Sequence, residues 1–229
     1  MADHLGDFGI SPEVSASVFI TSNHEDLPEY DGRRRLQELG YHLTKGEVGC
    51  FLAHRDAWKK VVAAGVPCLI LEDDARLDAA LVAHLESAAQ AIAGSTMMVR
   101  LFSMKTGRHK RWKELSAEFS LVRPLAAASS AVAYLISPAC AAALLGHSSK
   151  FWLAVDEFMD DEADHGCVVL QGYPQLVRHD DEGASMVGGR KKPPLSLGRK
   201  ILREIARVRR NISQALNRER TLWRLGLRP

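Results

Sequence analysis

The stretch "VPCLILEDDARLDAAL", Val66–Leu81, joins a short apolar segment to three consecutive acids and then to a helix-like pattern. Cys68–Leu71 has the length and apolar character of a buried strand. Glu72, Asp73 and Asp74 follow it directly. Three adjacent carboxylates repel one another, and near a buried strand end some would protonate unless a cation shared the site. The stretch therefore predicts a strand ending at a metal site, with a solvated strand-to-loop junction as the alternative.

Helical and strand-like patterns alternate on both sides of this stretch. The expected strands are Ala16–Thr21, Cys68–Leu71, Met97–Phe102 and Ala131–Ile136. The expected helices begin at the capping box Thr44 to Glu47, at Asp78 and at Ser137 with Pro138. This alternation predicts an α/β layer architecture. In such sheets ligands bind outside the carboxyl ends of strands, which is where the acids fall.

Composition indicates a globular chain. Its 229 residues are 46% hydrophobic and 25% charged, enough to bury one full core. The N-terminus "MADHLGDFGI" lacks the pattern of a secretory signal, and no run of about 18 apolar residues could span a bilayer, so we expect a cytoplasmic protein. The cysteines are widely spaced, and we expect all four to be reduced core residues: Cys50, Cys68, Cys140 and Cys167.

Charge divides the chain into an acidic body and a basic tail. Residues 1–187 carry 17 basic and 26 acidic side chains (net −9), whereas residues 188–229 carry 13 and 2 (net +11). The breaker-rich stretch "GGRKKPP", Gly188–Pro194, marks the boundary. We therefore expect a domain over residues 1–187 and a separate tail over residues 188–229.

The tail has the pattern of a basic amphipathic helix that Ser196 could cap. Its apolar residues recur at spacings of three and four, and they are Leu197, Ile201, Ile205, Val208, Ile212 and Leu216. Many arginines and Trp223 accompany them, which suits the inner surface of an anionic membrane. The alternative is that the stripe packs on the body or on a second copy in a homodimer. No base-reading module is present, so no nucleic-acid partner is expected.

The segment "LTKGEVGCFLAHRDAWKKV", joined to "LILEDDARL", resembles the glycosyltransferase family 25 pattern of lipopolysaccharide and lipooligosaccharide biosynthesis enzymes. The shared features are a Gly-Glu-aliphatic-Gly-Cys helix start, a His four residues after Cys50, and a strand ending in Glu-Asp-Asp. The stretches "AYLISPACAAALL", "VDEFMDDE" and "YPQLVRHDDEGASMVGGR" fit as well. The resemblance covers about residues 36–190, and the family's usual N-terminal strand and helix have no clear counterpart.

This resemblance implies a GT-A-like mixed sheet flanked by helices, with Mn²⁺ or Mg²⁺ holding a UDP-sugar donor. It implies transfer of a hexose, galactose or glucose, to a lipopolysaccharide or lipooligosaccharide core, with inversion of the sugar's configuration. Asp74 would be the leading metal ligand, with Glu72 and His179 completing the ligand set. Glu72 and Asp73 would also support the donor's ribose and sugar hydroxyls.

An inverting transferase needs a carboxylate that takes the acceptor's proton. Asp156 in "VDEFMDDEAD" matches the family's aspartate, with Glu157 as the substitute, although acids also stabilise a helix N-terminus. His54 lies on an apolar helix face, either as a buried structural residue or as a substrate contact. Arg111 and Trp112 in "KTGRHKRWK" could hold a phosphorylated acceptor, or simply belong to a solvated loop.

Two other classes of function compete with an active transferase. One is a sugar-nucleotide-binding protein of the same fold with weak or no turnover. The other is a metal-dependent phosphotransfer enzyme, which an acidic pocket after a strand would also serve. No Gly-rich phosphate loop accompanies the acids, which counts against the second class.

Overall fold

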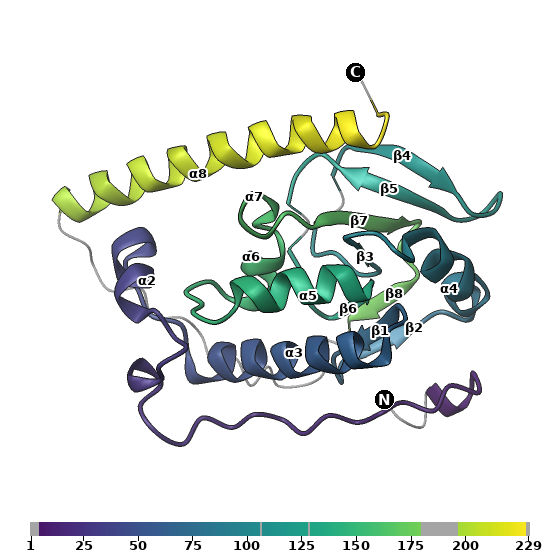
Figure 1. The fold of residues 1–229 in the computed structure, drawn as a ribbon, viewed down its shortest axis with the longest axis horizontal. Coiled ribbons are helices and arrows are strands. Elements are labelled where there is room, and N and C mark those ends of the chain that lie inside the picture. Colours follow the sequence, from purple (N-terminus) through teal and green to yellow (C-terminus); the bar gives the residue numbers. More distant parts are fainter. Residues whose placement is uncertain (1–4, 106, 128, 180–196, 228–229) are drawn as a thin grey trace.

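A six-stranded mixed sheet forms the centre of the molecule (Figure 1). The computed structural model describes residues 5–105, 107–127, 129–179 and 197–227. The strand order is β1-β6-β3-β7-β5-β4, in which β3 and β7 pair in parallel and the other neighbours pair antiparallel. The strands are β1 (Cys68–Leu71), β3 (Met97–Arg100), β4 (His109–Glu114), β5 (Ser120–Pro124), β6 (Ala133–Ile136) and β7 (Val168–Tyr173). A separate ribbon pairs β2 (Ala75–Leu77) with β8 (Val177–His179).

Helices cover both faces of this sheet. Side chains alternate between the faces along each strand, and the apolar side chains on each face are buried against helices. Met98, Tyr134 and Val169 share one core with α3, α5 and α6. Val99 and Leu135 directly follow Met98 and Tyr134 in their strands, so they face the other side of the sheet and share the second core with α4. The helices are α2 (Gly32–Leu39), α3 (Lys45–Ala64), α4 (Ala79–Ile92), α5 (Pro138–His147), α6 (Val155–Met159), α7 (Glu162–His165) and α8 (Leu197–Arg224), after a 3-10 turn η1 (His24–Asp26). The expected mixed α/β architecture is confirmed.

The elements around the acidic triplet form where local sequence signals place them. Thr44 and Glu47 make the predicted capping box at the start of α3, which ends at Gly65 in the left-handed conformation (φ 70°). Strand β1 has the predicted bounds, Cys68–Leu71. Asp78 caps α4 by accepting a hydrogen bond from the Ala80 amide (2.9 Å). These caps determine where the chain leaves α3, crosses the sheet edge and enters α4.

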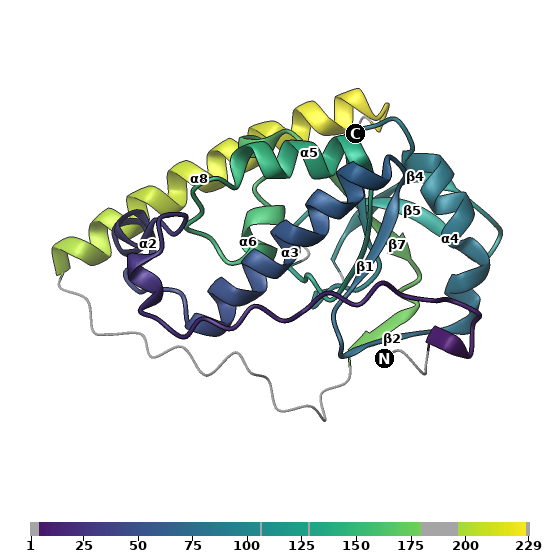
Figure 2. The same cartoon turned by 60° about the horizontal axis from the view of Figure 1, so that its bottom comes forward.

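The predicted strand Ala16–Thr21 is wrong, since this segment forms no strand. It runs as extended chain alongside α3 (Figures 1 and 2). Lys60 Nζ lies 2.7 Å from Glu13 Oε1, and Lys45 Nζ donates to the carbonyl of Thr21 (3.4 Å). The segment is held by side chains of α3 and has no neighbouring strand to pair with in the described structure. Its β-forming composition therefore does not lead to a strand.

Helix α8 confirms the predicted amphipathic tail helix, and it packs against the body. It contacts α2 and α7, and Leu222 near its end is buried. The Arg210 guanidinium lies 5.3 Å from the centre of the Trp152 ring. The predicted boundary at 187/188 and the Ser196 cap lie outside the described residues. Within the described part of the chain, no helix is long and apolar enough to cross a membrane.

All four cysteines are free thiols, as predicted. Cys140 and Cys167 are buried in the core, whereas Cys50 and Cys68 are only partly buried. The interpretation as core residues therefore holds for two of the four.

The close approach of the N-terminal segment to α3 depends on Gly49. A Cβ there would lie 2.3 Å from the carbonyl oxygen of Val18. We expect Gly49→Ala to lower the free energy of unfolding by about 1–3 kcal/mol, as overpacking does, even though Ala favours helix. Gly146→Ala is the matched control, because this helical glycine has open space around its Cβ position. Urea unfolding checks this, and a Gly49 variant as stable as the Gly146 variant would contradict it.

Candidate active site

The fold sends the three acids that follow β1 in different directions. The backbone N–H of Glu72 donates to Val132 (2.8 Å), which holds the triplet beside the start of β6. The Glu72 side chain points toward α3, where it contacts His54. Asp73 is exposed, and the Asp74 side chain reaches His179 on β8. Each carboxylate thus has a different environment, while the charges of Glu72 and Asp73 still act on Asp74.

A buried hydrogen-bond chain holds Glu72. Trp58 Nε1 donates to the Tyr134 hydroxyl (2.9 Å), which lies 2.8 Å from His54 Nδ1. His54 Nε2 lies 3.1 Å from Glu72 Oε1, and the Cys50 thiol donates to the same oxygen (3.6 Å). Because the ionised Glu72 carboxylate can only accept, His54 Nε2 donates to it, which leaves His54 Nδ1 to accept from the Tyr134 hydroxyl. Every polar group along this chain is satisfied.

The hydrogen-bond chain keeps Glu72 ionised. Burial alone would raise the pKa of Glu72, but the hydrogen bond and charge interaction with His54, together with the Cys50 thiol, bring this pKa below its ordinary value. Burial and the Glu72 charge raise the pKa of Cys50 strongly, and burial does the same for Tyr134. Glu72 is therefore an anion between a neutral thiol and an imidazole.

Asp74 and His179 form the arrangement that best fits a divalent cation. The register of the β2–β8 ribbon pairs Ala75 with His179, so His179 Nε2 lies 2.9 Å from Asp74 Oδ2. Asp74 Oδ1 is buried and has no hydrogen-bond partner within the described part of the chain. Burial and the charge of Glu72 raise the pKa of Asp74, against the opposing effect of His179. A carboxylate oxygen left in this state is one that Mn²⁺ or Mg²⁺ would satisfy.

A second group with ligand-type atoms contains Cys50, His54 and Glu72, whose atoms lie within 4.8 Å of one another. Cysteine binds metals as thiolate. Since the pKa of Cys50 is raised and all three side chains already bond to one another or to Tyr134, this group supports Glu72 rather than forming the metal centre.

Arg100 connects the end of β3 to the acids of α6. Its buried guanidinium donates to the carbonyl of Ser130 and to the carbonyl of Asp156 (3.2 Å). It also forms an ion pair with Asp160 Oδ1 (2.9 Å). Asp160 in turn accepts from the backbone and hydroxyl of Ser129, a residue in the left-handed region (φ 37°). One buried cation thus fixes the position of α6 relative to the sheet.

Asp156 and Glu157 are adjacent but differ in their surroundings. Burial and the neighbouring Glu157 charge raise the pKa of Asp156. The Asp156 charge also contributes to the raised pKa of Cys50, so Asp156 lies within electrostatic range of the Glu72 cluster. Glu157, by contrast, accepts from Arg35 (2.5 Å) and from the Ala154 amide (3.1 Å). Glu157 therefore holds α2 and α6 together through its ion pair with Arg35. The Asp156 carboxylate has no such ion pair in the described structure.

The structure does not bring Arg111 and Trp112 to the acids. One row of paired residues crosses the sheet through Ile70, Tyr134, Arg100, Gln171, Val122 and Arg111. Five strand spacings of about 4.8 Å place Arg111 roughly 24 Å from Ile70. Arg111 pairs with Glu114 (2.9 Å), and Trp112 packs on the core next to α4. Their predicted contact with the acceptor would have to occur at the far edge of the sheet.

The sequence predictions missed residues that assemble the site. The sequence pattern gives no site role to Tyr134, Arg100 or Asp160 and places Cys50 only in the core, although a lone arginine in an apolar strand is itself a signal of a buried ion pair. His54 is 5% exposed with both ring nitrogens engaged, which agrees with its interpretation as a buried structural residue. Its direct contact with a substrate stays a prediction.

The sequence of this chain is similar to proteins of one glycosyltransferase family. Residues 16–159 match glycosyltransferase family 25, described as an LPS biosynthesis protein. A Bos taurus protein named probable inactive glycosyltransferase 25 family member 3 is 32% identical over 151 residues, which cover 64% of this chain. Procollagen galactosyltransferase 1 of Danio rerio is 39% identical over 54 residues, 23% of this chain and 9% of the relative. The chain spans only 24% of the bovine relative's length.

Glu72 and Asp156 should affect stability with opposite signs as pH changes. The lowered pKa of Glu72 means that its carboxylate stabilises the fold above its ordinary value of 4.5, and that this contribution is lost as pH falls through the lowered pKa. We expect Glu72→Gln to be destabilising at pH 7, with a penalty that shrinks below pH 4.5. The raised pKa of Asp156 means that its ionised form destabilises the fold, so Asp156→Asn should be stabilising at pH 7.

The Asp156→Asn gain should shrink as pH falls through the raised pKa toward the ordinary value of 3.8. Urea titrations of both variants and the wild type between pH 3.5 and 7, run in one buffer series, measure both trends. Differences of the same sign for the two variants at pH 7 would contradict the assigned environments.

Proposed function

Because the chain belongs to glycosyltransferase family 25, we propose that it is a metal-dependent hexosyltransferase that uses a UDP-sugar. The donated sugar is galactose or glucose, and the acceptor is a lipopolysaccharide or lipooligosaccharide core. The observation that carries this proposal is the Asp74–His179 pair, in which a buried Asp74 oxygen near the ionised Glu72 has no hydrogen-bond partner among the described residues. Oxygen and imidazole ligands of this kind suit Mn²⁺ or Mg²⁺, which also bind diphosphates.

The residues around this pair have distinct roles in the proposed reaction. Asp74 and His179 would hold the ion with the Glu72 charge nearby, and the ion would supply positive charge to the departing diphosphate. Asp73 is exposed beside them and can accept hydrogen bonds from ribose or sugar hydroxyls. The Trp58–Tyr134–His54 chain keeps Glu72 oriented, so the metal side of the site needs little reorganisation when a donor binds.

Asp156 is the proposed general base that takes the proton of the acceptor hydroxyl as it attacks. Its raised pKa brings the carboxylate closer to the range in which proton transfer is efficient. The Arg100 guanidinium holds the Asp156 backbone, which orients the side chain without neutralising it through a direct ion pair in the described structure. A single base acting on the acceptor is consistent with inversion of the sugar configuration.

The names of the relatives support the sugar chemistry and leave two acceptor classes. The family description refers to LPS biosynthesis, and the fish relative is named as a galactosyltransferase acting on procollagen. We favour the glycolipid core as acceptor, because the sequence pattern resembles the lipooligosaccharide enzymes. Arg111 and Trp112 on β4 would then contact a distant part of a large acceptor.

A second candidate is a sugar-nucleotide-binding protein without turnover. The bovine and human relatives named as inactive favour it. In this case the metal side of the site would bind a donor, and no product would form. The two candidates therefore differ at Asp156 and agree at Asp74. A phosphotransfer enzyme, the remaining class, should show no preference between donor sugars.

Asp74→Asn tests the metal site. We expect this variant to lose Mn²⁺-dependent binding of UDP-galactose and UDP-glucose, because the amide removes a charged ligand at nearly constant volume. Isothermal titration with each donor, with and without Mn²⁺, measures the effect. Asp56→Asn is the matched control, since Asp56 is an exposed carboxylate on α3 paired with Lys59. Unchanged metal dependence in the Asp74 variant would exclude this site.

Asp156→Asn tests the proposed base. We expect kcat for hexose transfer to fall by about 10²-fold or more, while donor affinity changes little, because the base acts in the transition state. The control is Asp161→Asn, a partly buried acid of the same segment. A transfer rate unaffected by Asp156→Asn would assign the proton to another group, and donor binding with no transfer by the wild type would favour the inactive candidate.

A further inference from the structure

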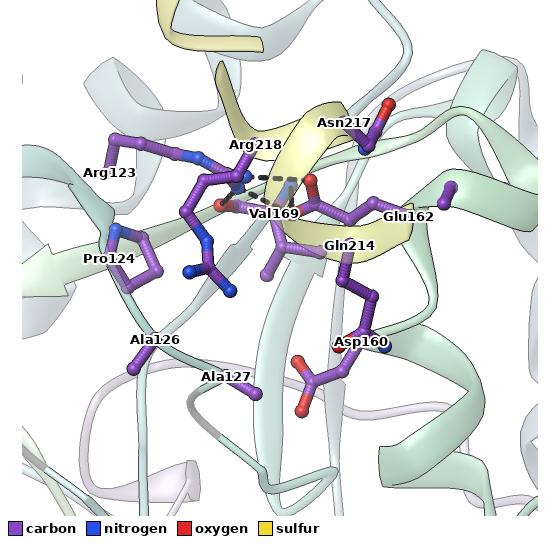
Figure 3. Close-up of a pocket in the computed structure, with 11 residues that line it drawn as sticks. Arg123, Pro124, Ala126, Ala127, Asp160, Glu162, Val169, Gln214, Asn217 and Arg218 are labelled. Atoms are coloured by element: carbon purple, nitrogen blue, oxygen red, sulfur yellow. Dashed lines mark hydrogen bonds and ion pairs between the residues drawn. The ribbon is translucent and has the colours of Figure 1, made fainter. Parts of the chain in front are cut away.

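Helix α8 attaches to the body through its polar face. Gln214, Asn217 and Arg218 line a cavity of about 30 Å³ together with Arg123 and Glu162 of the body. Figure 3 shows the Gln214 and Arg218 side chains extending from α8 past the Arg123–Glu162 ion pair toward this cavity. Thr221 and Leu222 are buried near the end of the helix, and Arg210 stacks over Trp152. These contacts fix which face of α8 is turned toward the protein.

The apolar stripe of α8 lies on the opposite face. Ile205, Val208, Ile212 and Leu216 are between 52% and 59% exposed, and Trp223 is 63% exposed. Their spacing of three, four, four and seven residues keeps them on one side of the helix. Surface helices of globular proteins normally bury this side and expose the polar one. The orientation of α8 is reversed, and the stripe forms a contiguous apolar surface of the kind that marks an interaction site.

The charge of α8 indicates what covers this stripe. The helix has nine basic and two acidic residues, and the basic residues are Arg199, Lys200, Arg203, Arg207, Arg209, Arg210, Arg218, Arg220 and Arg224. Among them Arg207, Arg209, Arg220 and Arg224 are exposed. Two copies pairing through this face would bring like charges together along the whole helix, which opposes association. An anionic lipid surface favours both the apolar stripe and its basic margins.

We propose that the exposed face of α8 binds an anionic bilayer surface, with the helix lying in the membrane plane. Ile205, Val208, Ile212 and Leu216 enter the boundary between headgroups and acyl chains, while Arg209 and Arg220 contact lipid phosphates. Trp223 lies on the same face, and its ring suits the interface. Because the opposite face of α8 is attached to the body, binding holds the whole domain at the lipid surface. This holds whether or not the chain turns over a sugar donor.

Vesicle flotation of the full chain tests this surface. The wild type should float with vesicles of phosphatidylcholine and phosphatidylglycerol, and should float much less with phosphatidylcholine alone. Recovery should fall as NaCl rises, because screening weakens the attraction of the arginines to lipid phosphate. The double variant Ile212→Asp, Leu216→Asp should lose most of the recovery, and since both side chains are exposed it should keep the fold.

The matched control is Asn211→Asp, Ser213→Asp, which adds the same charge at exposed positions beside the stripe. It should float substantially better than the Ile212, Leu216 variant. Equal loss in both variants would show that charge alone matters and would overturn insertion of the stripe. Failure of the wild type to float on phosphatidylglycerol vesicles would overturn the proposal, as would a homodimer in sedimentation that the Ile212, Leu216 variant dissociates, since a second copy would then cover the stripe.

Discussion

The Tyr134 hydroxyl is the point on which the arrangement of the site depends. It accepts from Trp58, bonds to His54, and through His54 determines where the Glu72 carboxylate lies. Two of these side chains come from α3, one from β6, and one from the residue after β1, so a single chain of hydrogen bonds ties three elements together. Breaking it leaves buried polar groups unsatisfied, which costs about 1–3 kcal/mol for each group. The helix cannot shift along the sheet without that penalty.

Around this network the fold separates carboxylates that the sequence places close together. Hydrogen bonds lower the pKa of Glu72, while burial raises the pKa values of Asp74 and Asp156. Environments that push the pKa values of neighbouring acids apart are typical of sites where the acids have different tasks. A stable anion, a carboxylate beside an imidazole and a second carboxylate with raised pKa suit the proposed metal-assisted sugar transfer.

Local signals predicted much of the fold because they act within a few residues. The capping box of Thr44 and Glu47, the Asp78 cap and the apolar run Cys68–Leu71 determine α3, α4 and β1 without help from distant segments. Prediction failed for Ala16–Thr21, whose composition suits a strand but whose neighbour is a helix. Spacing along the chain also could not reveal that β1 and β4 occupy opposite edges of the sheet, so the distance of Arg111 and Trp112 from the acids became visible only in the structure.

The sequence by itself determined the acidic triplet after a buried strand, the family pattern around it, and the amphipathic character of the tail. These properties depend on residue order and short-range periodicity. Only the tertiary structure decided that His179 meets Asp74, that Tyr134 and Arg100 support the acids, and that α8 turns its polar face inward. Such contacts depend on strand register and helix docking, which arise from the packing of the entire chain, so no local pattern can specify them.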